Sequence, residues 1–210
     1  MPHNLQEINR ALRGKDPLDI IAWAIDYSQG RALVSTNFRP LEAVILHLAT
    51  RVKPDLPVLW VDTGYNTPET YRFAESLIQR LRLNVKRFIP LRTAAHRDAL
   101  NRGIPAIEDP THDEFTREVK LEPFERGLRE LDPRVWFTAL RREQTPFRET
   151  LDYASEHTRG ILKVSPVFYF SEAQMEDYLR THDLPDEKNY YDPTKVLEKR
   201  ECGLHLNPQI

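Results

Sequence analysis

This sequence of 210 residues contains a single cysteine, Cys202, and that scarcity excludes several kinds of site. One thiol cannot form an intrachain disulfide, and it cannot hold a structural zinc ion or an iron–sulfur cluster, which need several thiolate or imidazole ligands. The sequence also lacks a long apolar run, since segments such as Val58–Val61 are far too short to span a bilayer. The net charge of −2 gives no reason to expect binding to nucleic acid or to a membrane surface.

The first residues, Met1 to Asn4, show neither the basic nor the apolar region of a signal peptide. We therefore expect a cytoplasmic protein, and a lone free thiol agrees with that reducing compartment. With 40% apolar and 30% charged residues the composition is that of an ordered globular protein, and the length suits one domain.

Short apolar segments alternate with helical patterns, and this alternation predicts an α/β fold. Strands are expected at residues 31–35, 57–61, 84–89, 136–140 and 162–167. Helices are expected at residues 5–13, 17–29, 41–50, 68–81, 93–101, 123–131 and 172–182. Such an order is typical of a mostly parallel sheet with helices on both faces. Little periodicity remains after residue 183, so we expect a single domain at 1–183 and a C-terminal tail at 184–210, either a mobile carrier of Cys202 or a frayed end.

Cys202 lies in the segment Lys199-Arg200-Glu201-Cys202-Gly203-Leu204-His205. The positive charges of Lys199, Arg200 and His205 favour the thiolate, and hence a reactive nucleophile. Glu201 acts in the opposite direction, and a buried structural cysteine is the alternative.

Two turns that follow predicted strands carry polar groups suited to a nucleotide. The first is Ser35-Thr36-Asn37-Phe38-Arg39-Pro40, whose hydroxyl, amide and guanidinium groups would suit a phosphate at a helix N-terminus. Its alternative is an ordinary N-cap. The second is Val61-Asp62-Thr63-Gly64-Tyr65, which would suit a ribose hydroxyl or a base edge. Its alternative is a strand-to-helix turn in which Asp and Gly act only locally.

Three arginines follow the predicted strand that begins at Trp136. Arg141, Arg142 and Arg148 are placed to bind phosphate or sulfate through bidentate hydrogen bonds. A solvated charge run, with Glu143 paired to one arginine, is the alternative. Lys120 either adds another cation or simply precedes a helix. The seven histidines show no metal-ligand spacing, so no metal site is expected.

Three stretches together resemble the thioredoxin-dependent phosphoadenylyl-sulfate (PAPS) reductases, within the wider family of adenylyl- and phosphoadenylyl-sulfate reductases. The stretches are Val61–Tyr65 with Pro68–Phe73, Trp136–Phe137 with Leu140–Gln144 and Arg148, and Lys199–His205. The resemblance extends over roughly residues 18–182 plus the terminus. It implies an adenine-nucleotide α-hydrolase-like fold of the PP-loop type.

The resemblance also implies a reaction. Cys202 would attack the sulfur of PAPS and take up the sulfo group as S-sulfocysteine, releasing adenosine 3′,5′-bisphosphate. Thioredoxin or glutaredoxin, as external reductant, would then attack the adduct and free sulfite. Besides catalytic Cys202, the substrate-binding residues expected on these grounds are Ser35, Thr36, Asn37, Phe38, Arg39, Asp62, Thr63, Gly64, Lys120, Arg141, Arg142, Arg148, Lys199, Arg200 and His205.

The cysteine count bears on the substrate. Relatives that hold a [4Fe–4S] cluster carry Cys-Cys pairs and typically prefer adenylyl sulfate (APS). This chain has no such pair, so the resemblance implies no cofactor and favours PAPS, with a clusterless APS reductase as the alternative. Family members are commonly dimers, and we therefore expect a homodimer.

The sequence departs from the family pattern at two places. Arg39-Pro40 stands where a small-residue turn is usual, and Cys202 follows Asp183 by only 19 positions, where a longer Gly-containing segment is usual. The short tail motivates an alternative function, a nucleotide-binding regulatory homologue with impaired chemistry. A fold relative that cleaves ATP between its α- and β-phosphates ranks last, because Ser-Gly-Gly-x-Asp-Ser is absent from residues 35–40.

Overall fold

The computed structural model describes residues 3–101 and 103–194 of the chain. Its α-helices are α1 (Leu5–Leu12), α2 (Pro17–Ser28), α3 (Glu42–Val52), α4 (Pro68–Leu81), α5 (Ala94–Asn101), α6 (His112–Thr116), α7 (Glu122–Leu131) and α8 (Glu172–Thr181). Its strands are β1 (Ala32–Thr36), β2 (Pro57–Val61), β3 (Asn84–Phe88), β4 (Val135–Phe137), β5 (Ala154–Glu156) and β6 (Leu162–Val164). The strands form a six-stranded sheet in the order β3-β2-β1-β4-β6-β5, in which only the edge pair β5·β6 is antiparallel.

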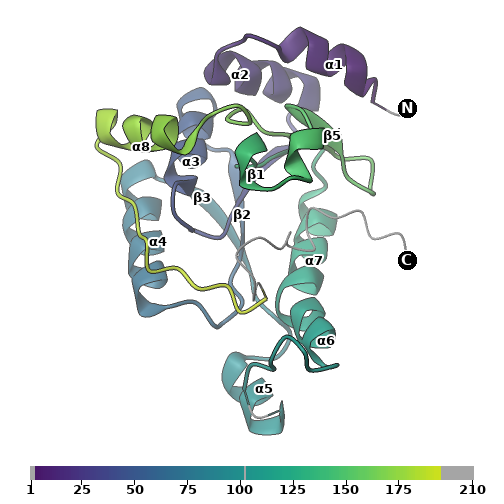
Figure 1. Ribbon diagram of the computed structural model, residues 1–210, viewed down its shortest axis with the longest axis vertical. Coiled ribbons are helices and arrows are strands. Elements are labelled where there is room, and N and C mark those ends of the chain that lie inside the picture. The colour runs from purple at the N-terminus through teal and green to yellow at the C-terminus, as the bar shows by residue number, and fades with distance from the viewer. Residues whose placement is uncertain (1–2, 102, 195–210) are drawn as a thin grey trace.

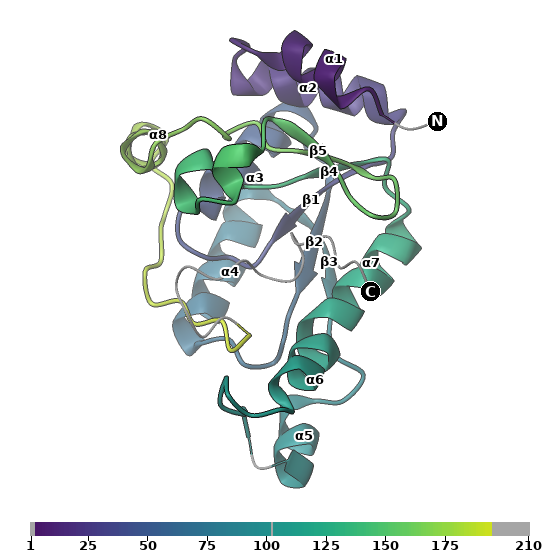
Figure 2. The same cartoon turned by 45° about the vertical axis from the view of Figure 1, so that its right-hand side comes forward.

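Helices cover the sheet on both faces, as Figures 1 and 2 show. Successive strand residues point to opposite faces. Val34 and Trp60 pack into the larger core with α2, α3, α4 and α8, whereas Leu33, Leu59 and Trp136 pack against α7. Both faces are apolar, which is why these strands read as continuous apolar runs in the sequence. The predicted mostly parallel α/β sheet is confirmed.

Local signals set the starts of the helices. Asp16 caps α2 ahead of Pro17, and Thr67 caps α4 ahead of Pro68. In α8 the Ser171 and Gln174 side chains each accept a backbone N–H of the other residue, forming a capping box. These caps explain why the helix boundaries near residues 17, 68 and 172 could be predicted.

Two strands are shorter than predicted. The strands expected at 136–140 and 162–167 end at Phe137 and Val164. The chain leaves the sheet there, and the Ser165 hydroxyl lies 2.9 Å from the carbonyl oxygens of both Thr138 and Leu140. Leu140 and Val167 stay buried outside the sheet, so burial extended the apolar pattern beyond the strands.

The region before α7 is more helical than predicted. Only a helix at 123–131 was expected, whereas α6, a π-helix at Arg117–Leu121 and α7 follow one another without a break. The Glu122 N–H donates to the carbonyl of Arg117, five residues back. Pro123 has no N–H to donate and would clash with a carbonyl in a regular α-helix, which accounts for the wider turn just before it. β5 was also not predicted, because of its three residues only Ala154 is buried.

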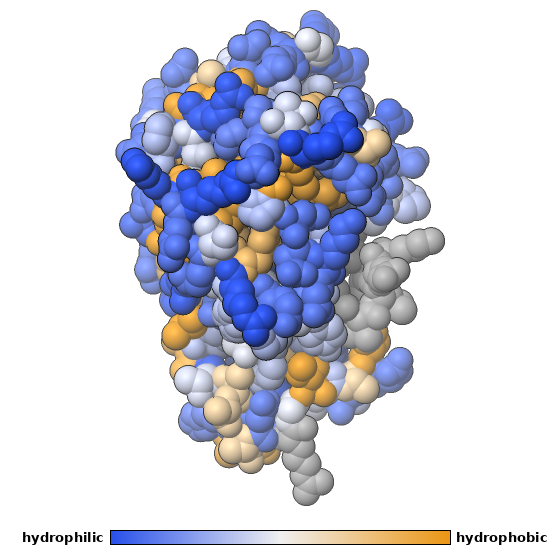
Figure 3. Space-filling model, turned by 90° about the vertical axis from the view of Figure 1, so that its left-hand side faces the viewer, coloured by the Kyte–Doolittle hydropathy of each residue, from blue (hydrophilic) through white to orange (hydrophobic). Residues whose placement is uncertain are grey.

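The residues after α8 lie against the domain. Residues 184–194, yellow in Figure 1, run past α4 toward the carboxyl end of the sheet. The face that carries α4 and α8 is largely hydrophilic, with apolar atoms showing between charged side chains (Figure 3). Within residues 3–101 and 103–194, no helix has the length and apolar character needed to cross a membrane. Cys202, Lys199, Arg200 and His205 lie outside the described residues.

Candidate active site

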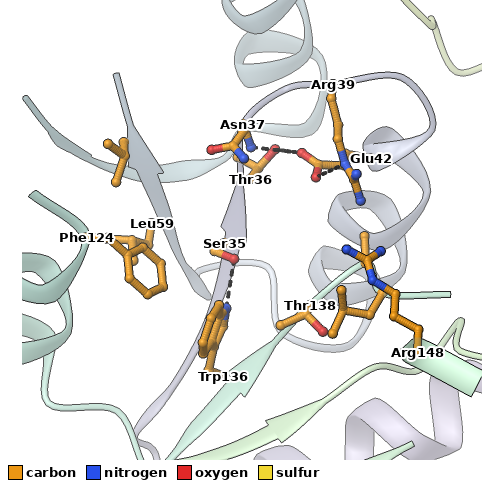
Figure 4. A pocket seen from close by; sticks show the side chains of 13 residues that line it. Ser35, Thr36, Asn37, Arg39, Glu42, Leu59, Phe124, Trp136, Thr138 and Arg148 are labelled. Carbon is orange, nitrogen blue, oxygen red and sulfur yellow. Dashed lines mark hydrogen bonds and ion pairs between the residues drawn. The ribbon is translucent and has the colours of Figure 1, made fainter. Parts of the chain in front are cut away.

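A cavity lies at the carboxyl ends of β1 and β4. From β1 the chain moves through β2 to β3 on one side, then returns to place β4 on the other side of β1. The loops that leave β1 and β4 therefore diverge, and such a switch point is where open α/β sheets bind their ligands. The cavity there, shown in Figure 4, is lined by Ser35, Thr36, Asn37, Arg39, Glu42, Leu59, Val61, Phe124, Trp136, Thr138, Ala139, Leu140 and Arg148.

The turn from β1 to α3 forms one wall of this cavity (Figure 4). The Ser35 Oγ accepts a hydrogen bond of 2.8 Å from the indole N–H of Trp136, which ties the end of β1 to β4. Phe38 and Leu41 have φ values of 52° and 69°, a region that side chains other than glycine rarely adopt. The Thr36 hydroxyl accepts the N–H of Phe38 at 2.9 Å and so stabilises this unusual turn.

The Glu42 carboxylate, at the first residue of α3, is the centre of the turn. It accepts hydrogen bonds from the Thr36 hydroxyl at 2.8 Å, the Asn37 N–H at 2.8 Å and the Arg39 Nε at 2.7 Å. The side chain is 8% exposed, and Arg39 forms an ion pair with it. The protein's own carboxylate thus takes up these three donors, which fixes the shape of the turn and the position of Arg39.

Two further arginines at these cavities come from the loop after β4. Buried Arg148 lies on the cavity wall, and its guanidinium donates to the Gln144 side-chain oxygen. Buried Arg141 lines a second cavity, which shares Arg39 and Glu42 with the first. Arg141 pairs with Glu143 and lies 3.8 Å from Glu172. The structure thus brings together Arg39, Arg141 and Arg148 around two adjoining cavities.

Arg142 lies elsewhere. Its side chain is exposed, and its guanidinium carbon lies 6.0 Å from the ring centroid of Tyr169. It lines a different hollow, with Glu149 and Phe168. Of the three arginines that follow β4, Arg141 and Arg148 are therefore the two that meet at the switch point.

The second predicted turn, after β2, acts locally in this structure. The Asp62 Oδ1 accepts from the Gly64 N–H at 3.0 Å, the Asn66 amide at 3.1 Å and the Tyr71 hydroxyl at 2.7 Å. Burial, together with the hydrogen bond to Asp62, raises the pKa of Tyr71 to about 12, so this phenol stays protonated. Neither Asp62 nor Thr63 nor Gly64 lines either cavity. Their predicted contact with substrate remains a prediction.

Two further predicted ligands point into protein. The Phe38 side chain is fully buried in the core and meets Trp60 edge-on, with 4.9 Å between ring centroids. The Lys120 ammonium pairs with Asp192 and donates to the Thr194 hydroxyl at 3.0 Å. Neither side chain lines a cavity at the switch point.

The comparison that decides the family concerns the same part of the chain. Residues 31–192 match the family model described as the phosphoadenosine phosphosulfate reductase domain. The chain belongs to this family. Its members named below are oxidoreductases of sulfate reduction, and the family's substrate is a phosphosulfate nucleotide. The residues that line both cavities lie within the matched range.

Relatives that match over nearly their full length support the same family assignment. The chain is 34% identical to the phosphoadenosine 5′-phosphosulfate reductase of Xylella fastidiosa (strain M12), over 97% of this chain and 95% of that one. It is 37% identical to the reductase of the same name from Synechococcus sp., over 97% of each chain. The crystal structure of PAPS reductase from Candida auris, in complex with phosphate, shares the fold with a TM-score of 0.76, 20% identity and 87% coverage of each chain.

Several cavity residues were not predicted from the sequence. Glu42, Thr138, Leu59 and Phe124 line the cavity, and none of them was a candidate. Thr138 directly follows β4, so the rule that ligands bind at strand ends could have found it. Glu42 resembled an ordinary acidic residue in the first turn of a helix, and only the folded turn shows three donors converging on it.

Proposed function

We propose that the protein reduces PAPS to sulfite and adenosine 3′,5′-bisphosphate by covalent catalysis at Cys202. The thiolate attacks the sulfur of PAPS, an S–S bond forms, and the bond from sulfur to the phosphate oxygen breaks. The nucleotide leaves with that electron pair, and Cys202 carries the sulfo group as S-sulfocysteine. A thioredoxin or glutaredoxin thiolate then attacks the Cys202 sulfur and releases sulfite, and the second thiol of the reductant resolves the mixed disulfide.

The single observation that carries this proposal is the arginine-lined cavity at the β1–β4 switch point, in a chain of this reductase family. The leaving group is a phosphate that gains charge as the bond to sulfur breaks. Arg148 and Arg141, fixed on buried walls, are placed to stabilise that charge. Arg39, held in place by its ion pair with Glu42 on the β1–α3 turn, adds a third cation that lines both cavities.

The choice of PAPS over APS rests on the single cysteine and on the names of the relatives. A chain with one cysteine cannot supply the Cys-Cys pairs of the cluster-containing reductases, so we propose a reaction without a metal cofactor. The similar proteins from Xylella fastidiosa and Synechococcus are both named for the phosphorylated nucleotide. A clusterless APS reductase is the alternative. We further propose a homodimer that works in the cytoplasm, where thiol reductants keep Cys202 reduced.

Replacing Cys202 by serine tests the proposal. We expect Cys202→Ser to abolish sulfite formation from PAPS with thioredoxin, because a hydroxyl cannot form the S-sulfocysteine whose S–S bond the reductant cleaves. Nucleotide affinity, measured by calorimetry, should stay within about twofold of the wild-type value, since the cavity lies in the unchanged domain. Sulfite formation at the wild-type rate by this variant would disprove covalent catalysis at Cys202. Wild-type protein that binds PAPS and forms no sulfite would instead support a regulatory homologue.

A further inference from the structure

The segment at residues 184–194, which we call the strap, is tied to two turns and to the π-helix of the domain. The Asp186 Oδ1 accepts the backbone N–H of Leu41, in the turn before α3, at 2.8 Å. The carbonyl of Asn189 accepts the hydroxyl of Thr67, the N-cap of α4, at 2.9 Å. The third tie joins Lys120 to Asp192 and Thr194. In Figure 1 the strap runs past α4 toward α6 and α7.

The third tie is a buried ion pair. The Lys120 and Asp192 side chains are only 2% and 6% exposed. The other carboxylate oxygen of Asp192 accepts the backbone N–H and the hydroxyl of Thr194, at 3.0 and 2.7 Å. Burial alone would raise the pKa of Asp192, but the charge of Lys120 and hydrogen bonds from Lys120 and Thr194 outweigh it and hold the pKa below its usual value. Because breaking such a pair leaves a buried charge without its partner, the pair holds the strap firmly.

The backbone that carries Lys120 has an unusual geometry. Lys120 lies in the π-helix at Arg117–Leu121, where the helix is wider than an α-helix. Inserted π turns change the direction of the side chains they carry, and they are frequent at functional sites. Here the turn directs an ammonium group at the strap, and the function described above makes no use of that contact.

The pair lies next to the anion site. Asp192, Tyr190 and Tyr191 line the second cavity together with Arg39 and Arg141. Cys202 follows Thr194 by only eight positions in the sequence. A fully extended chain of eight residues spans about 28 Å at most, so the pair sets the point from which Cys202 can reach substrate. A short tether of this kind raises the effective concentration of the group that it carries.

We infer that Lys120 and Asp192 are positioning residues. Their ion pair fixes residues 192–194, from which the chain continues to Cys202, at the wall of the cavity that Arg39 and Arg141 line. This inference rests on the proposed function. It assigns Lys120 a contact with the strap and not with the nucleotide. Breaking the pair should therefore slow the attack by Cys202 and leave nucleotide binding intact.

The test uses the full chain with Asp192→Asn, and Asp183→Asn as the matched control. Asp183 lies one residue before the strap, and its side chain is 96% exposed in a surface pair with Arg80. In a single turnover with saturating PAPS, we expect Asp192→Asn to form the Cys202 adduct about tenfold or more slowly, with nucleotide affinity within about twofold of wild type. The control should react at the wild-type rate.

The reversed pair, Lys120→Asp with Asp192→Lys, guards against a variant that fails to fold. It should form the adduct faster than either single reversal, and thermal unfolding of each variant shows whether the domain is intact. An adduct rate unchanged in folded Asp192→Asn would overturn the inference. So would a Lys120→Met variant that loses nucleotide affinity, because Lys120 would then bind substrate. Failure of the proposed function is distinguishable, since the wild-type protein itself would form no adduct.

Discussion

The Glu42 carboxylate and the arginines around it show how single side chains build the site. Glu42 collects three donors of the β1–α3 turn, while Arg148 and Arg141 come from the loop after β4. Buried cations held in fixed positions need little rearrangement when an anion binds, which makes them effective in stabilising charge. Anion binding at this site therefore depends on which arginines face the cavity.

Arg148→Ala should weaken nucleotide binding more than Arg142→Ala does. Arg148 is buried on the cavity wall, whereas Arg142 is exposed beside Tyr169. Loss of a hydrogen bond to a charged group costs about 1.5–3 kcal/mol, or about ten- to a hundredfold in affinity. Calorimetric titration of both variants with adenosine 3′,5′-bisphosphate measures the difference. An equal loss for the two variants, or a larger loss for Arg142→Ala, would contradict the placement of the anion site.

Some of these residues could be predicted and others could not. Ser35 and Arg141 carry a local signal, because polar groups at the end of an apolar strand stand out in the sequence, and Arg148 belongs to the same group of arginines. Phe38 carried the same signal by position alone, and its positive φ turns the ring into the core instead. Glu42 gave no signal, since its role depends on the folded turn. Cys202, Lys199, Arg200 and His205 remain predictions, outside the described residues.

At the scale of elements, α7 shapes the cavity by packing unusually close to the sheet. Its Gly127 faces β2 and β3, and a Cβ there would lie 2.5 Å from Leu59 Cδ1 and 3.1 Å from the Phe88 ring. Leu59 and Phe124 also line the cavity, so the close contact between α7 and β2 sets the position of this wall.

We expect Gly127→Ala to lower the free energy of unfolding. Alanine favours the helix by about 1 kcal/mol relative to glycine. Overpacking a well-filled core costs about 1–3 kcal/mol, and here two buried side chains must move. The net loss should be about 1 kcal/mol, measured by denaturant unfolding, with Glu130→Ala on the exposed side of α7 as the control. A free energy of unfolding of Gly127→Ala equal to or above that of the wild type would contradict this expectation, because it would show that Leu59 and Phe88 move aside at little cost.

Elements with strong local signals were predicted within one or two residues, as β2 and α4 illustrate. The predictions were wrong where tertiary packing, and not local secondary-structure propensity, determines the residue type or the backbone conformation. Leu140 and Val167 are apolar because they are buried, not because they belong to strands, and the π-helix reflects a conflict between Pro123 and a continuing helix. Sequence patterns indicate burial and secondary-structure propensity. Neither of these determines at which residue a strand leaves the sheet, or where a helix changes from i→i+4 to i→i+5 hydrogen bonds.

At the scale of the whole molecule, the site exists because β4 returns to the other side of β1. The alternation of strands and helices predicts a parallel sheet, but it does not specify which strands are neighbours. That order brings Ser35 and Trp136, 101 residues apart in the sequence, within hydrogen-bonding distance. The same organisation carries the strap from α8 across the carboxyl end of the sheet to Lys120, so three segments far apart in the sequence hold the chain up to Thr194.

Mass spectrometry of the full-length protein after incubation with PAPS, in the absence of any thiol reductant, tests this account most directly. We predict a mass increase of about 80 Da on the peptide that contains Cys202, the increment of one sulfo group, and its loss when reduced thioredoxin is added. A parallel incubation with APS shows which nucleotide reacts. An unmodified Cys202 peptide, in protein that nevertheless releases sulfite once thioredoxin is present, would contradict the proposed mechanism.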